Sequence, residues 1–162
     1  GYDLLLESVR LIQDDLRRLH YEIHIYGNGE EKEALIHFIN QYQLAEIIKI
    51  YESTQELSSK LAQSKIVVVP SRNEGFGMII LEAMSQENIV ISFEGNVGPD
   101  SIVENGKNGY LVSHGNVSEL AKRIDLTTQH YNELEHIVTN SKATLKNFSP
   151  DAIYQDFISI FN

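Results

Sequence analysis

The fold of this chain is set by residues 67–82, which read VVVPSRNEGFGMIILE. An apolar, β-branched run comes first, a polar loop with two glycines follows, and an apolar helical pattern ends the stretch. This order predicts a buried strand, a loop and a helix. Because a helix N-terminus presents unpaired amides and the positive end of the helix dipole, a phosphate is the ligand expected in front of it.

Two glycines and two glutamates flank this predicted helix start. Gly75 and Gly77 keep side chains out of the approach path. Glu74 lies in the loop and Glu82 lies eight residues later in the helix, a span that suits the two ends of one long ligand. An isolated pair of glutamates is more often a solvated loop acid and a surface helix acid. The surrounding Gly-Phe-Gly is what favours a site.

Strand-like and helix-like spacings of apolar residues alternate along the chain. Strands are expected at residues 21–26, 47–51, 65–69, 89–93 and 110–112, and helices at about 3–19, around 35–42, at 54–64, at 78–87, in a short segment ending at 104, and at 116–128, 130–147 and 150–161. The strand at 65–69 looks buried on both faces. This alternation predicts an α/β fold with a mostly parallel sheet, helices on both faces and a helical C-terminus.

Ligands of such sheets bind beyond the carboxyl ends of the strands. The loops after Tyr26, Tyr51 and Val69 should therefore open on one edge. The glycine-bearing loop of residues 70–77 is among them.

Length and composition limit the function classes. The 162 residues are expected to form one domain. The hydrophobic content of 42%, without a long apolar run, favours a soluble protein, and the absence of cysteine fits a reducing compartment, so we expect a cytoplasmic location. A formal charge of −10 opposes nonspecific binding to nucleic acid, and no nucleic-acid partner is expected.

The run Glu74-Gly75-Phe76-Gly77, followed by Glu82-Ala83-Met84, resembles the motif of retaining glycosyltransferases of family 4. Residues 27–29 (GNG) and 105–112 (NGKNGYLV) fall where that family has similar segments, so the likeness covers nearly the whole chain. The resemblance implies the C-terminal, Rossmann-like half of the two-domain GT-B fold, which binds the nucleotide-sugar donor.

The resemblance also implies roles for the motif residues. Glu82 would accept hydrogen bonds from the two ribose hydroxyls of the nucleotide, and Glu74, the expected catalytic residue, from hydroxyls of the donor sugar. With Gly75 leaving room, the amides of Phe76, Gly77 and Met78 would face phosphate and sugar and stabilise charge on the leaving diphosphate. No side chain of the loop is expected to act as a base.

Four further residues are candidates for the donor site. Gly27 and Gly29 would lie near the diphosphate by resemblance, and a tight strand-to-helix turn explains them equally well. Tyr51 ends a strand on the ligand edge, where it would contact the base or serve only in packing. Arg72 is a cation beside the site, either a ligand contact or a solvated loop arginine.

No metal and no cofactor are expected, and the nucleotide-sugar is a substrate. The six histidines show no HExxH spacing, and no Asp-x-Asp occurs. The lack of an acidic pair also disfavours the class of sugar transferases in which such a pair holds a divalent ion on the diphosphate.

Two departures from the family pattern matter. Residues 85–89 (SQENI) stand where relatives have a Gly-x-Pro turn, so that helix end should be longer or looser. The chain also starts at the glycine that in the family follows a first strand bearing an arginine and a lysine aimed at the diphosphate. We therefore expect residues 1–162 to be an excised C-terminal domain that lacks this strand and the N-terminal acceptor domain. The isolated domain should be inactive, and membrane association would be possible only through the missing half.

The sequence thus predicts the donor-binding domain of a hexosyltransferase, with UDP as the expected nucleotide and a glycan, lipid or protein acceptor. The alternative is a noncatalytic partner or scaffold domain, and the intact glutamates and glycines favour the enzyme. A nicotinamide-dependent dehydrogenase needs Gly-x-Gly-x-x-Gly, and residues 27–32 (GNGEEK) lack the third glycine.

The expected last helix, at about residues 150–161, is apolar over more than one face. We expect it to dock on the missing domain and, in the isolated chain, to favour self-association. Burial within its own domain is the alternative.

Overall fold

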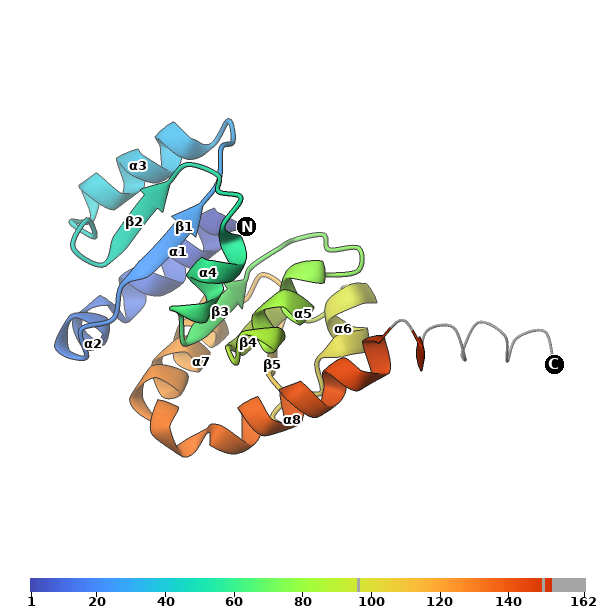
Figure 1. The fold of residues 1–162 in the computed structure, drawn as a ribbon. Helices are drawn as coiled ribbons and strands as arrows, with labels where there is room; N and C mark the ends of the chain where they lie inside the picture. The colour runs from blue at the N-terminus through green and yellow to red at the C-terminus, as the bar shows by residue number, and fades with distance from the viewer. Residues whose placement is uncertain (96, 150, 153–162) are drawn as a thin grey trace.

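The computed structural model of the chain describes residues 1–95, 97–149 and 151–152. It is an α/β fold in which helices and strands alternate through most of the chain (Figure 1). The strands are β1 (Ile23–Tyr26), β2 (Ile48–Tyr51), β3 (Ile66–Val69), β4 (Ile89–Phe93) and β5 (Tyr110–Val112). The helices are α1 (Tyr2–Leu11), α2 (Gln13–Arg18), α3 (Lys32–Gln41), α4 (Leu57–Ala62), α5 (Met78–Ser85), α6 (Val97–Ile102), α7 (Val117–Gln129) and α8 (Glu135–Leu145), with 3-10 turns η1 (Tyr131–Glu133) and η2 (Lys146–Phe148).

Every strand pairing among the described residues is parallel, as the sequence predicts. The pairings form two sheets: β1 pairs with β2, and β4 lies between β3 and β5. Ile23 is opposite Ile48 in the first sheet, and Ile66 is opposite Ile89 in the second. The expectation of one sheet is therefore corrected to two, because no described strand pairing joins β1 or β2 to β3, β4 or β5.

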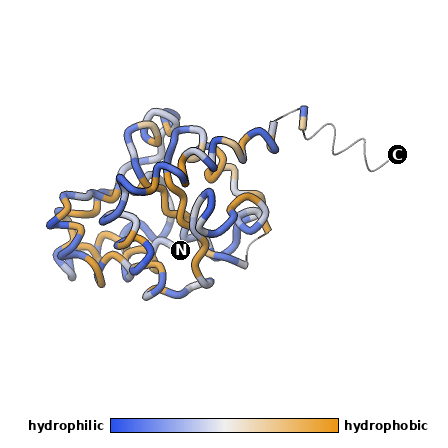
Figure 2. The backbone as a smooth tube through the Cα atoms, turned by 90° about the horizontal axis from the view of Figure 1, so that it is seen from below, coloured by the Kyte–Doolittle hydropathy of each residue, from blue (hydrophilic) through white to orange (hydrophobic). Residues whose placement is uncertain are grey.

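Helices cover both faces, as expected. Helix α1 contacts both α3 and α7 on one side, whereas α4, α6 and α8 gather around α5 on the other. Strand β4 lies between the two layers, because Ile89, Ile91 and Phe93 join the first core cluster and Val90 joins the second. Figure 2 shows the hydrophobic backbone segments running through the interior between these layers.

The helix expected over residues 3–19 is two helices, α1 and α2. Ile12 has φ −120° and ψ 16°, which ends α1 and begins α2. After α2, His20 takes a left-handed φ of 56°, and the amide of Tyr21 donates to the carbonyl of Leu16 over 3.0 Å. This helix-ending motif delays β1 to Ile23, two residues later than expected.

Other boundaries differ in smaller ways. The helix expected at 54–64 is shorter (α4), and the segment expected at 130–147 is η1, α8 and η2. The expected loop at residues 94–100 ends early because α6 begins at Val97, with Pro99 in its first turn. Strand β3 is fully buried only at Val69, so the expectation of burial on both faces holds at one residue. Its other residues are part-buried because β3 has one unpaired edge.

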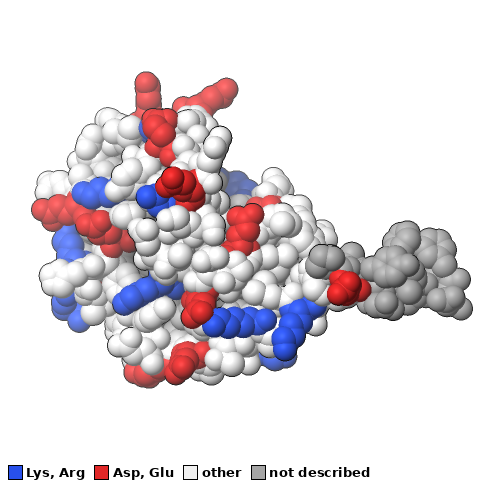
Figure 3. All heavy atoms as spheres, in the orientation of Figure 1, with Lys and Arg blue, Asp and Glu red and all other residues white. Residues whose placement is uncertain are grey.

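Acidic and basic side chains are interspersed on the face drawn in Figure 3. Within the described part of the chain, no helix has the length and apolar content needed to cross a bilayer. The expected docking helix at 150–161 lies outside the described residues except for 151–152, which are helical. Its predicted exposure and the self-association therefore remain predictions.

Candidate functional site

The loop between β3 and α5 is held by a left-handed glycine. Gly77 has φ 83° and ψ 46° and is the residue that precedes the first turn of α5. A Cβ added there would lie 3.1 Å from the side chain of Ile80, which is fully buried. Backbone conformation and packing therefore both require glycine at this position. The sequence argument had given Gly77 the tasks of leaving space for a ligand and of presenting its amide, and had not identified this structural requirement.

A second glycine supports the loop from behind. A Cβ added at Gly98, in α6, would lie 2.1 Å from the carbonyl oxygen of Phe76 and 2.6 Å from that of Gly75. The loop backbone therefore rests directly on the start of α6. Sequence reasoning missed Gly98, although the Gly98-Pro99 pair is a signal of special backbone geometry there.

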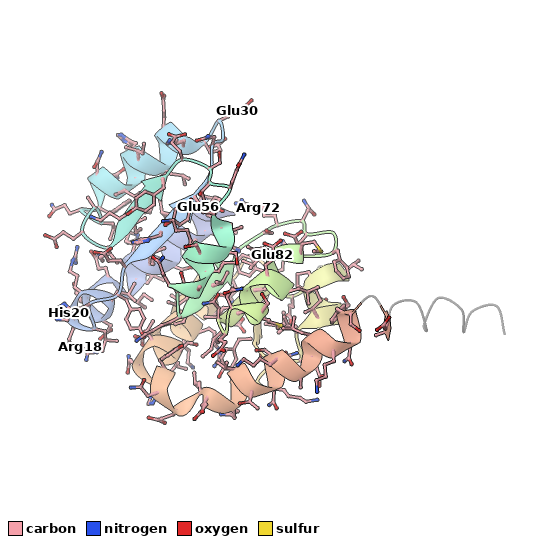
Figure 4. The ribbon with its side chains drawn as sticks, in the orientation of Figure 1. Arg18, His20, Glu30, Glu56, Arg72 and Glu82 are labelled. Carbon is pink, nitrogen blue, oxygen red and sulfur yellow. The ribbon has the colours of Figure 1, made fainter. Side chains whose placement is uncertain are left out.

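The two motif carboxylates have different surroundings. Glu74 is half-buried, and its Oε2 accepts a hydrogen bond from Ser71 Oγ over 3.2 Å. Glu82 is exposed and lies one helical turn beyond Met78, the first residue of α5 (Figure 4). Phe76 and Met78, with exposed fractions of 46% and 58%, flank the helix start. Gly75, Phe76 and Met78 are thus exposed around the start of α5, whereas Gly77 itself is buried. In the sequence, Glu74 precedes this start and Glu82 follows it.

Arg72, the cation of the loop, is paired with Asp3 in the first turn of α1. Its Nη1 lies 2.8 Å from Oδ1 and its Nη2 lies 2.5 Å from Oδ2, a bidentate arrangement. Hydrogen bonding to Arg72 lowers the pKa of Asp3 to about 2, and the same pair raises the pKa of Arg72. Arg72 therefore connects the loop to α1, and the pair places the positive charge of Arg72 at the edge of the sheet. The contact of Arg72 with the donor remains a prediction. Asp3 was missed because its partner is 69 residues away.

The loop after β1 is more open. A Cβ added at Gly27 or Gly29 would meet no described atom within 4 Å, so neither glycine is required by packing. Asn28 Nδ2 donates to Ser53 Oγ over 3.2 Å, which joins this loop to the loop after β2. An ion pair between Lys32 and Glu52 makes a second link. The contacts of Asn28 and Lys32 with the loop after β2 therefore hold this turn in place, and there is free space beside both glycines.

Tyr51 belongs to an aromatic group on the first sheet. Its ring stacks on Tyr26 with centroids 5.0 Å apart and planes 18° apart, and His24 meets it edge-on at 5.2 Å. Tyr51 therefore packs against its neighbours while 41% of its surface stays exposed, and its contact with the base remains a prediction.

The strands bring these loops to one edge of the molecule. Lys65 and Tyr21, which precede β3 and β1, meet with the ammonium 5.8 Å from the ring centroid, so both strands start at the same end. The loops after β1, β2 and β3 consequently open at the opposite end (Figure 1). This is the edge that the sequence predicts for a ligand.

Among residues 1–95, 97–149 and 151–152, no group of three or more His, Asp or Glu side chains is arranged to hold a metal ion. The independence from metals and cofactors stays a prediction. The arrangement of the described site is suited to an anionic ligand at the α5 N-terminus with hydroxyl groups directed at the carboxylates.

Comparisons with known proteins agree with this arrangement. A poly(ribitol-phosphate) alpha-N-acetylglucosaminyltransferase of Staphylococcus aureus (strain COL) is 28% identical over 163 residues, which cover 99% of this chain and 32% of that protein. The crystal structure of S. aureus TarM in complex with fondaparinux, alpha-GlcNAc-glycerol and UDP superposes with a TM-score of 0.87 at 25% identity, over 100% of this chain and 33% of TarM.

A third likeness is to an isolated domain. The C-terminal domain of the glycosyl transferase group 1 family protein LpcC from Francisella tularensis matches with a TM-score of 0.78 at 24% identity, over 91% of this chain and 78% of that one. The fold is thus that of the C-terminal half of GT-B glycosyltransferases, and this chain spans about a third of the length of the staphylococcal proteins. The family described as glycosyl transferases group 1 matches residues 1–144, and the chain therefore belongs to this family.

Proposed function

We propose that this chain is the donor-binding domain of a retaining glycosyltransferase that moves a hexose-type sugar from a UDP-sugar to a glycan, lipid or protein acceptor. One observation carries the proposal: Gly77 and Gly98 hold the N-terminus of α5, which Glu74 precedes and Glu82 follows in the sequence. The family match supports glycosyl transfer, and the UDP in the TarM structure supports the nucleotide.

The proposed roles follow from charge and geometry. Glu82 accepts hydrogen bonds from the two ribose hydroxyls, while Glu74, steadied by Ser71, accepts from hydroxyls of the sugar. The bond between the sugar's anomeric carbon and the diphosphate oxygen breaks, and an acceptor hydroxyl oxygen bonds to that carbon and passes its proton to the leaving diphosphate. Negative charge grows on the diphosphate as the first bond breaks. The α5 N-terminus, with the amides of Phe76, Gly77 and Met78, stabilises this charge.

Several expectations are part of the proposal. The parent protein works in the cytoplasm without a metal, and the domain alone is inactive because transfer needs the acceptor half. The intact glutamates and glycines favour this enzyme over a noncatalytic partner domain.

Titration calorimetry on this chain tests the donor roles. UDP should bind near the millimolar range, because contacts from the expected upstream strand are absent. Glu82→Ala should weaken UDP and UDP-N-acetylglucosamine alike by roughly 1.5–3 kcal/mol, whereas Glu74→Ala should weaken only the sugar nucleotide by a similar amount. A chelator should change neither affinity.

Glu135→Ala is the matched control, because Glu135 is an exposed glutamate in the first turn of α8. It should bind both ligands like the unmodified chain. The opposite order of effects at Glu74 and Glu82 would contradict the assigned roles, and equal binding by all variants would contradict the site.

A further inference from the structure

The loop before α5 contacts the segment after α8 through two phenylalanine rings. The rings of Phe76, in the loop, and Phe148, in η2, have centroids 6.0 Å apart and planes 69° apart, an edge-to-face arrangement. Phe76 is 46% exposed, whereas Phe148 is part-buried and packs with Leu145 against the second core cluster. The exposed ring of the loop is thus in contact with a ring that is anchored on the core.

Helix α8 contacts α5 at both ends. The two helices lie side by side, and α8 runs in the direction opposite to α5 (Figure 1). Lys142 of α8 pairs over 2.6 Å with Glu87, which follows the C-terminal end of α5. Phe148 reaches Phe76 at the N-terminal end of α5. The segment from Lys142 to Phe148 therefore spans the helix that carries the glutamate motif.

A buried asparagine fixes the position of α8. Asn108, which is only 1% exposed, lies between α6 and β5. Its Nδ2 donates to Thr144 Oγ1 in α8 over 2.8 Å and to the carbonyl oxygen of Ile102 in α6 over 3.0 Å. Because buried polar groups are costly to leave unpaired, these bonds hold α8 in one position relative to α6. Phe148 follows α8 by three residues and is therefore presented from a fixed support.

The backbone and the side chain of Phe76 have separate supports. Gly98 lies directly against the carbonyl oxygen of Phe76, while Phe148 lies against its ring. The rotamer of a side chain depends on the φ and ψ angles of its own residue, so a ring held in one place also restricts the adjoining peptide planes. These planes carry the amides of Phe76 and Gly77, which are the proposed contacts of the diphosphate and sugar.

We propose that Phe148 is a positioning residue of the donor site: through the ring of Phe76, it sets the orientation of the loop amides that bind the diphosphate. The inference rests on the proposed function for its ligand. Phe148 acts only through Phe76 and has no contact with the donor. When the ring of Phe148 is removed, the ring of Phe76 loses its support and turns toward solvent, and the loop amides lose their common orientation.

NMR titration with UDP tests the role of Phe148 in binding. Phe148→Ala should weaken UDP binding about two- to tenfold, the range for the loss of one aromatic pair. Phe148→Leu keeps apolar volume on the second core cluster, so it should fold like the unmodified chain and still weaken binding about twofold or more. Phe148→Tyr keeps the ring and should bind UDP as the unmodified chain does.

Phe38→Ala is the matched control. Phe38 is also part-buried, and its ring centroid lies 4.6 Å from that of Tyr42. It belongs to α3 and packs against the first core cluster. Phe38→Ala should lower the melting temperature about as much as Phe148→Ala does and leave UDP binding unchanged. If both variants weakened UDP binding equally, the effect of Phe148 would be one of general stability, and the proposal would be overturned.

The dynamics of the ligand-free chain separate this inference from the proposed function. The heteronuclear Overhauser effect of the Gly75, Phe76 and Gly77 amides should fall in Phe148→Ala and recover in Phe148→Tyr, with no nucleotide present. A chain that shows this loss of order but never binds UDP would contradict the proposed ligand. A chain that binds UDP, but in which Phe148→Ala changes neither the loop amides nor the affinity, would overturn the inference alone.

Discussion

Strands β4 and β1 are of similar length, yet they differ in sequence pattern and in burial: β4 reads IVISF, an almost continuous apolar run, whereas β1 reads IHIY. All five residues of β4 are buried, whereas only Ile25 is buried among the four of β1. The difference arises from position, because β4 has a strand on each side and a helical layer on each face. Strand β1 has a paired strand on one side only. The nearly continuous apolar run thus occupies the strand with neighbours on every side, and the alternating sequence occupies a strand at the edge of its sheet.

The proposed donor contacts are divided between the well-packed half around β4 and the more open half around β1. The loop with Glu74 and Gly77 is attached to the well-packed half, where α5 contacts β3, β4, α6 and α8. The stacked rings of Tyr26 and Tyr51 belong to the open half. In the proposed function, the firmly packed loop would contact the diphosphate and sugar. The more accessible pair of rings would lie toward the base.

The largest expected effect contrasts one aromatic residue from each half. Phe93→Ala should reduce the free energy of unfolding by about 3–5 kcal/mol, because Phe93 is completely buried. Tyr51→Ala should cost only about 0.5–1.5 kcal/mol, since a half-exposed stacked ring is lost. Urea denaturation of both variants measures the difference. Equal losses would show that the two halves are packed alike.

An intermediate effect is expected where α6 supports the motif loop. Gly98→Ala should destabilise the chain by roughly 1–3 kcal/mol and weaken UDP binding, because the new methyl group displaces the backbone at Phe76. Val97→Ala is the control, since Val97 is the preceding residue and is 83% exposed. Thermal unfolding and calorimetry measure the two effects. If a folded Gly98→Ala variant bound UDP as the unmodified chain does, the position of the loop backbone at Phe76 would not matter for UDP binding.

The smallest expected effect concerns the pair that joins the two halves. Asp3→Asn should cost less than about 1 kcal/mol near neutral pH, because the pair with Arg72 is exposed to solvent. The pKa of Asp3 is lowered from 3.8 to about 2, so its contribution is present above about pH 4 and is lost as the pH falls to about 2.

Unfolding of this variant and the unmodified chain, followed between pH 2 and pH 7, should give curves that converge at the acid end. Asp14→Asn is the control, because Asp14 also pairs with an arginine but within α2 and at 95% exposure. A constant difference across this pH range would mean that the ion pair contributes nothing measurable.

The sequence by itself predicted the parts that depend on local pattern. The bounds of β4 and β5 agree with prediction, and α5 begins at Met78 as predicted, because β-branched runs and a glycine-to-helix junction are encoded within a few residues. The motif also pointed to the glycosyltransferases, and the family match confirms group 1, while membership of family 4 remains a prediction. The predicted parallel sheet indicated the edge on which the loops open. Roles of single residues in the donor site remain predictions.

Only the tertiary structure decided the contacts between distant segments. The pairing of Asp3 with Arg72 and the packing of Gly98 on Phe76 join segments that no local pattern relates. The same holds for the cavity that residues of β1 and β3 both line. The break at Ile12 was equally hidden, because α1 and α2 bury Leu5, Val9 and Leu16 in one cluster and so keep the spacing of a continuous helix. Hydrophobic periodicity records which face of an element is buried, whereas its neighbour is selected by packing and hydrogen bonding across the whole fold.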